Sequence, residues 1–140
     1  MTWAVQGGDL RRHYVSDEQA AVWDAEGIDW RAAAFRNVSE LGSLGGFGTK
    51  QDEAGCVFIK VMLNDDGLGP SRLFVPNLFT NELGDDYRVA IPELTCAVAF
   101  RKSLTSEQEA DVTGIISGCY GQGTTPVSDE RFGAADFWIG

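Results

Sequence analysis

The sequence predicts an α+β fold, with an antiparallel sheet of about 4–5 strands packed by two or three helices in a single domain. Apolar, strand-like segments gather in the middle of the chain, whereas segments with helix-capping sequences stand near both ends. The chain has 140 residues, the length of one domain, and its 15 aromatic side chains can build a core. We therefore expect one domain over residues 1–140.

The first predicted elements are helical. Ser16 opens an S-x-x-Q capping box followed by two acids, which a helix N-terminus favours, and this helix should stop at Gly27. Residues 29–38 contain three consecutive alanines, which favour a second helix. An extended conformation, which would place Trp30 and Ala34 on one face, stays open as the alternative.

A glycine-rich segment separates these helices from the predicted sheet. Residues 42–48 contain four glycines and predict a loop. Residues 56–63 are almost continuously apolar and predict a strand covered on both faces. The Asp66-Gly67 turn then predicts a hairpin into a second strand at 72–75, which Pro76 would end or mark as an edge.

Two further strands follow along the chain. Tyr87, Val89 and Ile91 alternate with other residues, which predicts a short half-buried strand closed by Pro92. Residues 95–100 predict a second core strand.

The clearest helix begins after Thr105, where two capping boxes overlap, and should end at Gly121–Gly123. Its apolar residues recur at i, i+3, i+4 and i+7 and form one stripe: Val112, Ile115, Ile116 and Cys119. The apolar tail at 132–139 should dock as a final strand or lid.

The opposite face of this helix carries almost no side chains, because it consists of Ala110, Gly114, Ser117 and Gly118. An interior glycine costs about 1 kcal/mol of helix stability relative to alanine, so a close neighbour is expected to offset that cost. The first expectation is a helix sandwiched within its own domain. The second is that this face receives a partner loop or a dimer mate, the latter forming a homodimer through Ala110, Gly114 and Gly118.

The three cysteines, Cys56, Cys96 and Cys119, are far apart and form no CxxC pair. Cys56 and Cys96 lie in apolar runs, and Cys119 completes the apolar stripe, so we expect three free thiols in the core. The start of the chain lacks a signal-peptide pattern, and no apolar run approaches the ~18 residues of a membrane span. Cytoplasmic localisation is the resulting expectation.

The chain is strongly acidic, with 21 acids, 11 bases and a net charge of −10, of which residues 105–140 carry −5. Such a surface repels nucleic acid and anionic lipid, so we expect neither as a partner. It attracts a basic protein instead. A charge that serves only solubility is the alternative.

Recognisable site chemistry is scarce. The Gly42–Gly48 loop has the wrong spacing for a phosphate-binding motif, and His13, beside Arg11 and Arg12, lacks an identifiable partner for general-base chemistry. The pairs Asp65-Asp66 and Asp85-Asp86 fit solvated turns or a partner-facing patch better than a cation site. We predict no catalytic residue, no cofactor and no metal.

These observations lead to the hypothesis of a non-enzymatic binding module that covers a basic functional surface of another protein. Such modules include inhibitors, immunity proteins, antitoxin-like proteins and chaperones, and their partners include toxins and nucleic-acid-processing enzymes. The expected contacts are Asp65, Asp66, Glu82, Asp85, Asp86, Asp129 and Glu130. The alternatives are a small enzyme or ligand-binding domain near His13 and the Gly42–Gly48 loop, and a structural subunit of a homo-oligomer.

Overall fold

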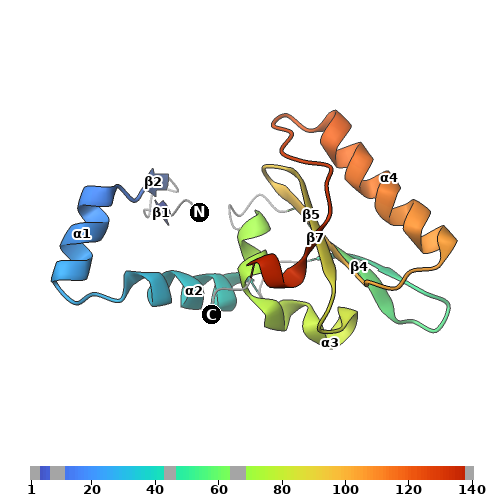
Figure 1. The fold of residues 1–140 in the computed structure, drawn as a ribbon, viewed down its shortest axis with the longest axis horizontal. Helices are drawn as coiled ribbons and strands as arrows, with labels where there is room; N and C mark the ends of the chain where they lie inside the picture. Colours follow the sequence, from blue (N-terminus) through green and yellow to red (C-terminus); the bar gives the residue numbers. More distant parts are fainter. Residues whose placement is uncertain (1–3, 7–11, 43–46, 64–68, 138–140) are drawn as a thin grey trace. The chain divides into compact units, whose positions relative to one another are not determined.

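The computed structural model describes residues 4–6, 12–42, 47–63 and 69–137 (Figure 1). The chain divides into two compact units, residues 1–34 and residues 35–140, and the division falls within helix α2. The expectation of one domain over residues 1–140 stays a prediction.

The first unit contains two short strands, helix α1 and the start of helix α2. Strands β1 (Ala4–Gln6) and β2 (Arg12–Tyr14) pair antiparallel, and helices α1 (Asp17–Ala25) and α2 (Trp30–Gly42) follow. The Ser16 hydroxyl accepts a hydrogen bond from the Gln19 amide at 3.1 Å, as the capping sequence predicts. Both predicted helices are confirmed, whereas the β1–β2 pair was not predicted.

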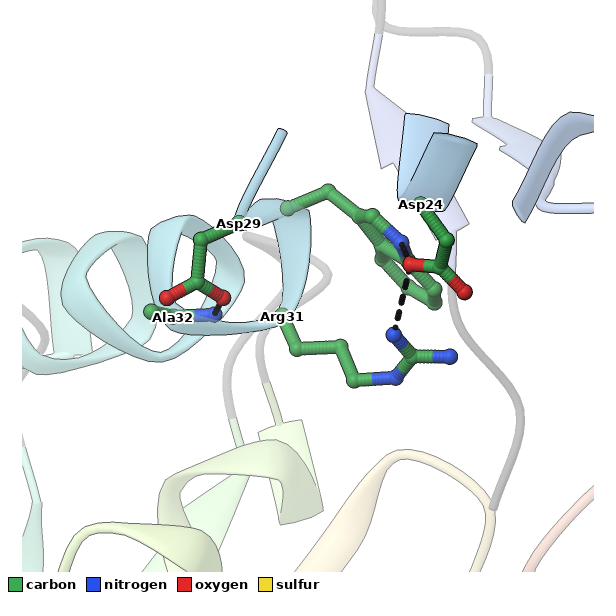
Figure 2. A network of polar contacts seen from close by, with 5 residues as sticks. Asp24, Asp29, Arg31 and Ala32 are labelled. Carbon is green, nitrogen blue, oxygen red and sulfur yellow. Dashed lines mark hydrogen bonds and ion pairs between the residues drawn. The ribbon is translucent and has the colours of Figure 1, made fainter. Parts of the chain in front are cut away.

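A polar network fixes the corner between α1 and α2 (Figure 2). Asp24 Oδ1 accepts hydrogen bonds from the Trp30 indole at 2.9 Å and from the Arg31 guanidinium at 3.0 Å. These two donors hold the pKa of the Asp24 carboxyl below its ordinary value. Asp29 accepts from the Ala32 amide at 3.2 Å and so caps the start of α2.

The second unit is built on a five-stranded antiparallel sheet in the order β3-β4-β6-β5-β7, which confirms the predicted α+β class. The predicted strands near 56–63, 87–91 and 95–100 are β4, β5 and β6. The strands are β3 (Gly48–Gln51), β4 (Val57–Leu63), β5 (Arg88–Glu93), β6 (Cys96–Phe100) and β7 (Phe132–Gly133).

Helix α4 (Ser106–Gln122) covers one face of this sheet (Figure 1). The complete capping box between Thr105 and Gln108 confirms the predicted start of the helix. The predicted apolar stripe packs on Ile59, Val98 and Phe100 of the sheet. Burial of this stripe fixes which face of α4 points inward.

The other face is covered by short helical turns. These are the 3₁₀ helices η1 (Gly69–Phe74), η2 (Pro76–Leu78) and η3 (Ala134–Phe137), and the short helix α3 (Thr80–Leu83). Phe79 is fully buried there, with its ring centroid 5.4 Å from that of Tyr87 and 5.9 Å from that of Phe47. The tail docks through β7 and η3 over residues 132–137, as predicted, and residues 138–139 lie outside the described residues.

The hairpin predicted from residues 56–63 into a strand at 72–75 is wrong. Residues 69–74 form η1 instead, and β4 is paired on one edge with β3 and on the other with β6. Because both edges of β4 are occupied, residues 72–75 have no free edge of β4 with which to pair. Gly48 belongs to β3, so the strand begins inside the segment that was predicted as loop.

Pro92 does not close β5 but lies inside it. The pairing of β5 with β6 shifts register between Ala90 and Glu93, which accommodates a residue that has no amide hydrogen. The Pro92 carbonyl accepts a hydrogen bond at 3.0 Å from Val127, in the segment after α4. Val89 and Ala90, on opposite faces, are both buried, so β5 is more deeply covered than the predicted half-buried strand.

Candidate partner-binding surface

Five of the seven predicted contact residues belong to the described part of the chain, and all five are exposed. Glu82 lies in α3, and Asp85 and Asp86 lie in the turn before β5. Asp129 and Glu130 lie between α4 and β7. The other two, Asp65 and Asp66, lie outside the described residues.

Glu82 is already engaged within the fold. Its carboxylate pairs with Lys60, whose buried ammonium also donates a hydrogen bond to the Leu78 carbonyl at 2.8 Å. The same ammonium lies 4.6 Å from the centroid of the Phe47 ring. A buried cation needs such a counter-charge. The charge of Glu82 therefore neutralises Lys60 and is less available to bind a partner protein.

The remaining acids differ in their neighbours. The Asp86 carboxylate lies 3.5 Å from the Lys102 ammonium, an exposed pair that water screens. Asp85, Asp129 and Glu130 form no ion pair within the described ranges. Their charges face solvent directly.

Most of the bases in residues 35–140 form ion pairs with carboxylates of the same unit. Residues 35–140 hold 15 acids and 8 bases, for a net charge of −7. The ion pairs there join each of the chain's lysines to a carboxylate, and two arginines as well: Lys50–Asp111, Lys60–Glu82, Lys102–Asp86, Arg101–Asp52 and Arg131–Glu109. The surplus charge turned toward solvent is therefore negative.

The strand ends that flank the two predicted acid pairs do not meet. Leu63, the last residue of β4, pairs with Cys96, whereas Arg88, the first residue of β5, pairs with Phe100. Cys96 and Phe100 are the two ends of β6. The end of β4 and the start of β5 therefore lie at opposite ends of the sheet, which does not favour one merged acidic patch.

Exposed apolar side chains mark one end of the sheet instead. Leu63, Leu94 and Val127 are 63%, 60% and 51% exposed. The Leu94 amide donates to the Thr125 carbonyl at 3.1 Å, which holds the β5–β6 turn against the segment after α4. We call Leu63, Leu94 and Val127 the sheet-end patch; Asp129 and Glu130 follow Val127 in the chain.

The sheet-end patch was not predictable because apolar residues at strand ends have the same pattern as core residues. Their exposure depends on which neighbours cover the sheet, which is a tertiary property. Glu93, which holds this end of the sheet together, was missed as well, because a carboxylate that forms buried hydrogen bonds leaves no distinct pattern in the sequence.

The Glu93 side chain is the polar anchor of this region and is only 7% exposed. One carboxylate oxygen accepts from both the Thr95 hydroxyl and the Thr95 amide, and the other accepts from the Thr125 amide at 3.2 Å. The Thr95 hydroxyl, followed by its amide, holds the pKa of Glu93 below its ordinary value. The charged form therefore ties the β5–β6 turn to the segment that follows α4.

Glu93 should make stability at this end of the sheet depend on pH. Because its folded pKa lies below the unfolded value, its contribution is present above about pH 4.3 and is lost as pH falls through the folded pKa. Glu93→Gln should therefore melt below wild type at pH 7, with a smaller difference at pH 3, as measured by circular dichroism. Glu53→Gln, an exposed control, should melt like wild type at both pH values, and an unchanged Glu93→Gln difference would contradict this role.

The structure adds little support for the two alternative sites, the region of His13 and the Gly42–Gly48 loop and the small-residue face of α4. The His13 backbone pairs with Val5, but its side chain and residues 43–46 of the glycine-rich loop lie outside what is described. On α4, Ala110 and Gly114 are exposed, and a Cβ built at Gly114 or Gly118 meets nothing within 4 Å. Within the described residues nothing packs closely on Gly114 or Gly118, so the sandwich within the domain and the homodimer through this face both stay predictions.

All three cysteines are free thiols, but they differ in burial. Cys56 is exposed rather than in the core, because it lies in the turn before β4. Cys96 is buried and Cys119 half-buried, and their sulfur atoms are 3.3 Å apart. Within the described ranges, no three His, Cys, Asp or Glu side chains gather to hold a metal ion, and no helix has the length and apolarity to cross a membrane.

Comparisons of this chain with family models, with curated proteins and with solved structures each found no match.

Proposed function

We propose that this protein is a non-enzymatic binding module that covers a basic surface of a partner protein. The observation that carries the proposal is the distribution of charge in residues 35–140. Five of the eight bases there pair with carboxylates of the same chain, while Asp85, Asp129 and Glu130 face solvent without an ion pair to any described residue. A surface of this kind attracts a positively charged partner.

The sheet-end patch supplies the second property that an interface needs. Protein interfaces combine a desolvated apolar centre with a polar rim, and charged residues steer the approach more than they hold the complex. Leu94 and Val127 would form the apolar centre, and Asp129 and Glu130 would form part of its rim.

The partner class follows from the chemistry of these acids. Carboxylates on loops can occupy the positions where a basic enzyme or toxin holds the phosphates of its substrate. Inhibition of such a cytoplasmic partner is the activity that we propose. Asp65, Asp66, Glu82, Asp85 and Asp86 remain candidate contacts, with Glu82 and Asp86 weakened by their own ion pairs.

The test distinguishes residues that speed association from residues that slow dissociation. Immobilised wild type first captures binding proteins from native lysate at low salt, and the main captured protein is purified. Stopped-flow association then compares wild type with Asp129→Asn/Glu130→Gln, which should bind about three- to tenfold more slowly at low salt and converge with wild type at high salt. Leu94→Ser/Val127→Ser should instead speed dissociation, because apolar contacts govern the lifetime of a complex.

A matched control removes the same number of charges elsewhere. Glu53→Gln/Glu107→Gln changes two exposed acids without ion pairs, in the β3–β4 turn and in the first turn of α4. The β3–β4 turn lies at the other end of the sheet from Leu63. If the control slows association as much as Asp129→Asn/Glu130→Gln, net charge alone drives binding and the proposed surface is wrong.

A further inference from the structure

Two cysteine side chains from different elements meet beneath the end of α4. Cys96 is the first residue of β6, and Cys119 lies in the last turn of α4, three residues before its end. Their sulfur atoms are 3.3 Å apart, and both side chains belong to the apolar layer between the helix and the sheet. This contact is independent of the acidic surface discussed above.

The separation of the sulfur atoms is close to what a covalent link needs. A disulfide has an S–S distance of about 2.05 Å, so the atoms must approach by little more than 1 Å. Rotation of the half-buried Cys119 side chain can supply that movement, because its outer side is not fully covered. The link would close a loop of 23 residues that contains most of α4.

The two thiols differ in their access to solvent. Cys119 is the thiol that an oxidant from solvent can reach, since Cys96 is 1% exposed. Burial, followed by the adjacent Cys119 sulfur and the Glu93 carboxylate, raises the pKa of Cys96 to about 12. Attack on an oxidant therefore begins at Cys119, and the Cys96 thiolate, scarce at neutral pH, completes the reaction more quickly as pH rises.

We propose that a thiol oxidant of the glutathione disulfide class converts Cys96 and Cys119 into a reversible disulfide that joins β6 to α4. The Cys119 thiolate attacks one sulfur of glutathione disulfide, which forms a mixed disulfide and releases one glutathione. The Cys96 thiolate then attacks the Cys119 sulfur and expels the second glutathione. Two protons and two electrons pass from the protein thiols to the two glutathione products.

Peptide mapping tests the link directly, with the full chain carrying Cys56→Ser to remove the exposed thiol. The protein is incubated with glutathione disulfide at pH 8, alkylated, and digested with trypsin without reduction. Cleavage after Arg88, Arg101, Lys102 and Arg131 places Cys96 in peptide 89–101 and Cys119 in peptide 103–131. We expect these two peptides to be joined, and to separate after treatment with dithiothreitol.

A thermal measurement reports the effect on the fold. The oxidised monomer should melt about 5–10 °C above the reduced one, since the link restricts the unfolded chain. Cys119→Ser, which changes the more exposed partner, should fold and show neither the linked peptides nor the thermal shift. Unlinked peptides, a Cys119–glutathione adduct that persists at pH 9, or links only between separate chains would each overturn the proposal.

Discussion

Replacing Phe100 with alanine is expected to lower the free energy of unfolding by about 3–5 kcal/mol, which is a large part of the stability of a domain of this size. Its ring is 2% exposed and packs with Ile59 and Val112 between the sheet and α4. The Arg131 guanidinium covers the ring at 5.3 Å from its centroid. Removing the ring leaves a cavity whose walls, strands β4 and β6 and helix α4, cannot all collapse. Urea denaturation followed by fluorescence measures the loss.

Two further variants test this expectation, one at another core position and one at an exposed position. Phe58→Ala, at a residue 4% exposed in the same layer, should cost a similar amount, about 3–5 kcal/mol. Leu63→Ala removes an exposed side chain and should stay within about 0.5 kcal/mol of wild type. A midpoint for Phe100→Ala close to that of Leu63→Ala would show that the layer between α4 and the sheet is not packed as described.

Gly123→Ala should destabilise the protein by about 2–3 kcal/mol, although the substitution adds only one methyl group. The φ angle of −69° suits any residue, so the cost comes from space and not from backbone strain. A Cβ at this position would lie 2.3 Å from Glu93 Cγ and 2.6 Å from the Cys119 carbonyl oxygen. Neither neighbour moves freely, because Glu93 is held by three hydrogen bonds and Cys119 by the helix.

A stabilising effect is expected at two glycines inside α4, five and nine residues before Gly123. Gly114→Ala and Gly118→Ala place a Cβ in open space and should each stabilise the protein by about 0.5–1 kcal/mol. Chemical denaturation of the three alanine variants side by side gives the comparison. Sedimentation of Gly114→Ala also tests the dimer through Ala110, Gly114 and Gly118, because a close-packed interface would loosen. A stabilised Gly123→Ala would show that the segment after α4 is placed wrongly.

The local elements were predictable because local chemistry determines them. Ser16 and Thr105 cap their helices through hydrogen bonds to residues three positions later, which a sequence displays directly. The stripe from Val112 to Cys119 likewise follows from the period of one helix. Long apolar runs identified β4 and β6 because a strand buried on both faces has little choice of composition.

The strand predictions were wrong where distant parts of the chain compete to pair with the same edge of a strand. Residues 72–75 have the composition of a strand, but β3 and β6 already occupy both edges of β4. All four residues of strand β3, Gly48–Gln51, are exposed, and none has an apolar side chain that would predict a strand. Its place depends on pairing with β4, which local propensity does not encode.

The candidate site was predictable only in its charge. Exposure of Asp85, Asp129 and Glu130 agrees with their places in polar connections. The pairing of Glu82 with Lys60 was not foreseeable, because it joins residues 22 positions apart across a buried layer. The contact between Cys96 and Cys119 likewise depends on how α4 lies over β6.

The way the sheet ends has a consequence for the behaviour of the protein at high concentration. Strands β4 and β6 would be prone to intermolecular stacking if their backbones were open, but both lie inside the sheet. The outermost strands are β3, four exposed residues with a lysine and a register irregularity, and β7, with two residues. Short, charged and irregular borders are poor templates for another chain. Fibril formation through the strands of this five-stranded sheet should therefore require unfolding first, and agitation of the native protein followed by a dye that reports fibrils measures it.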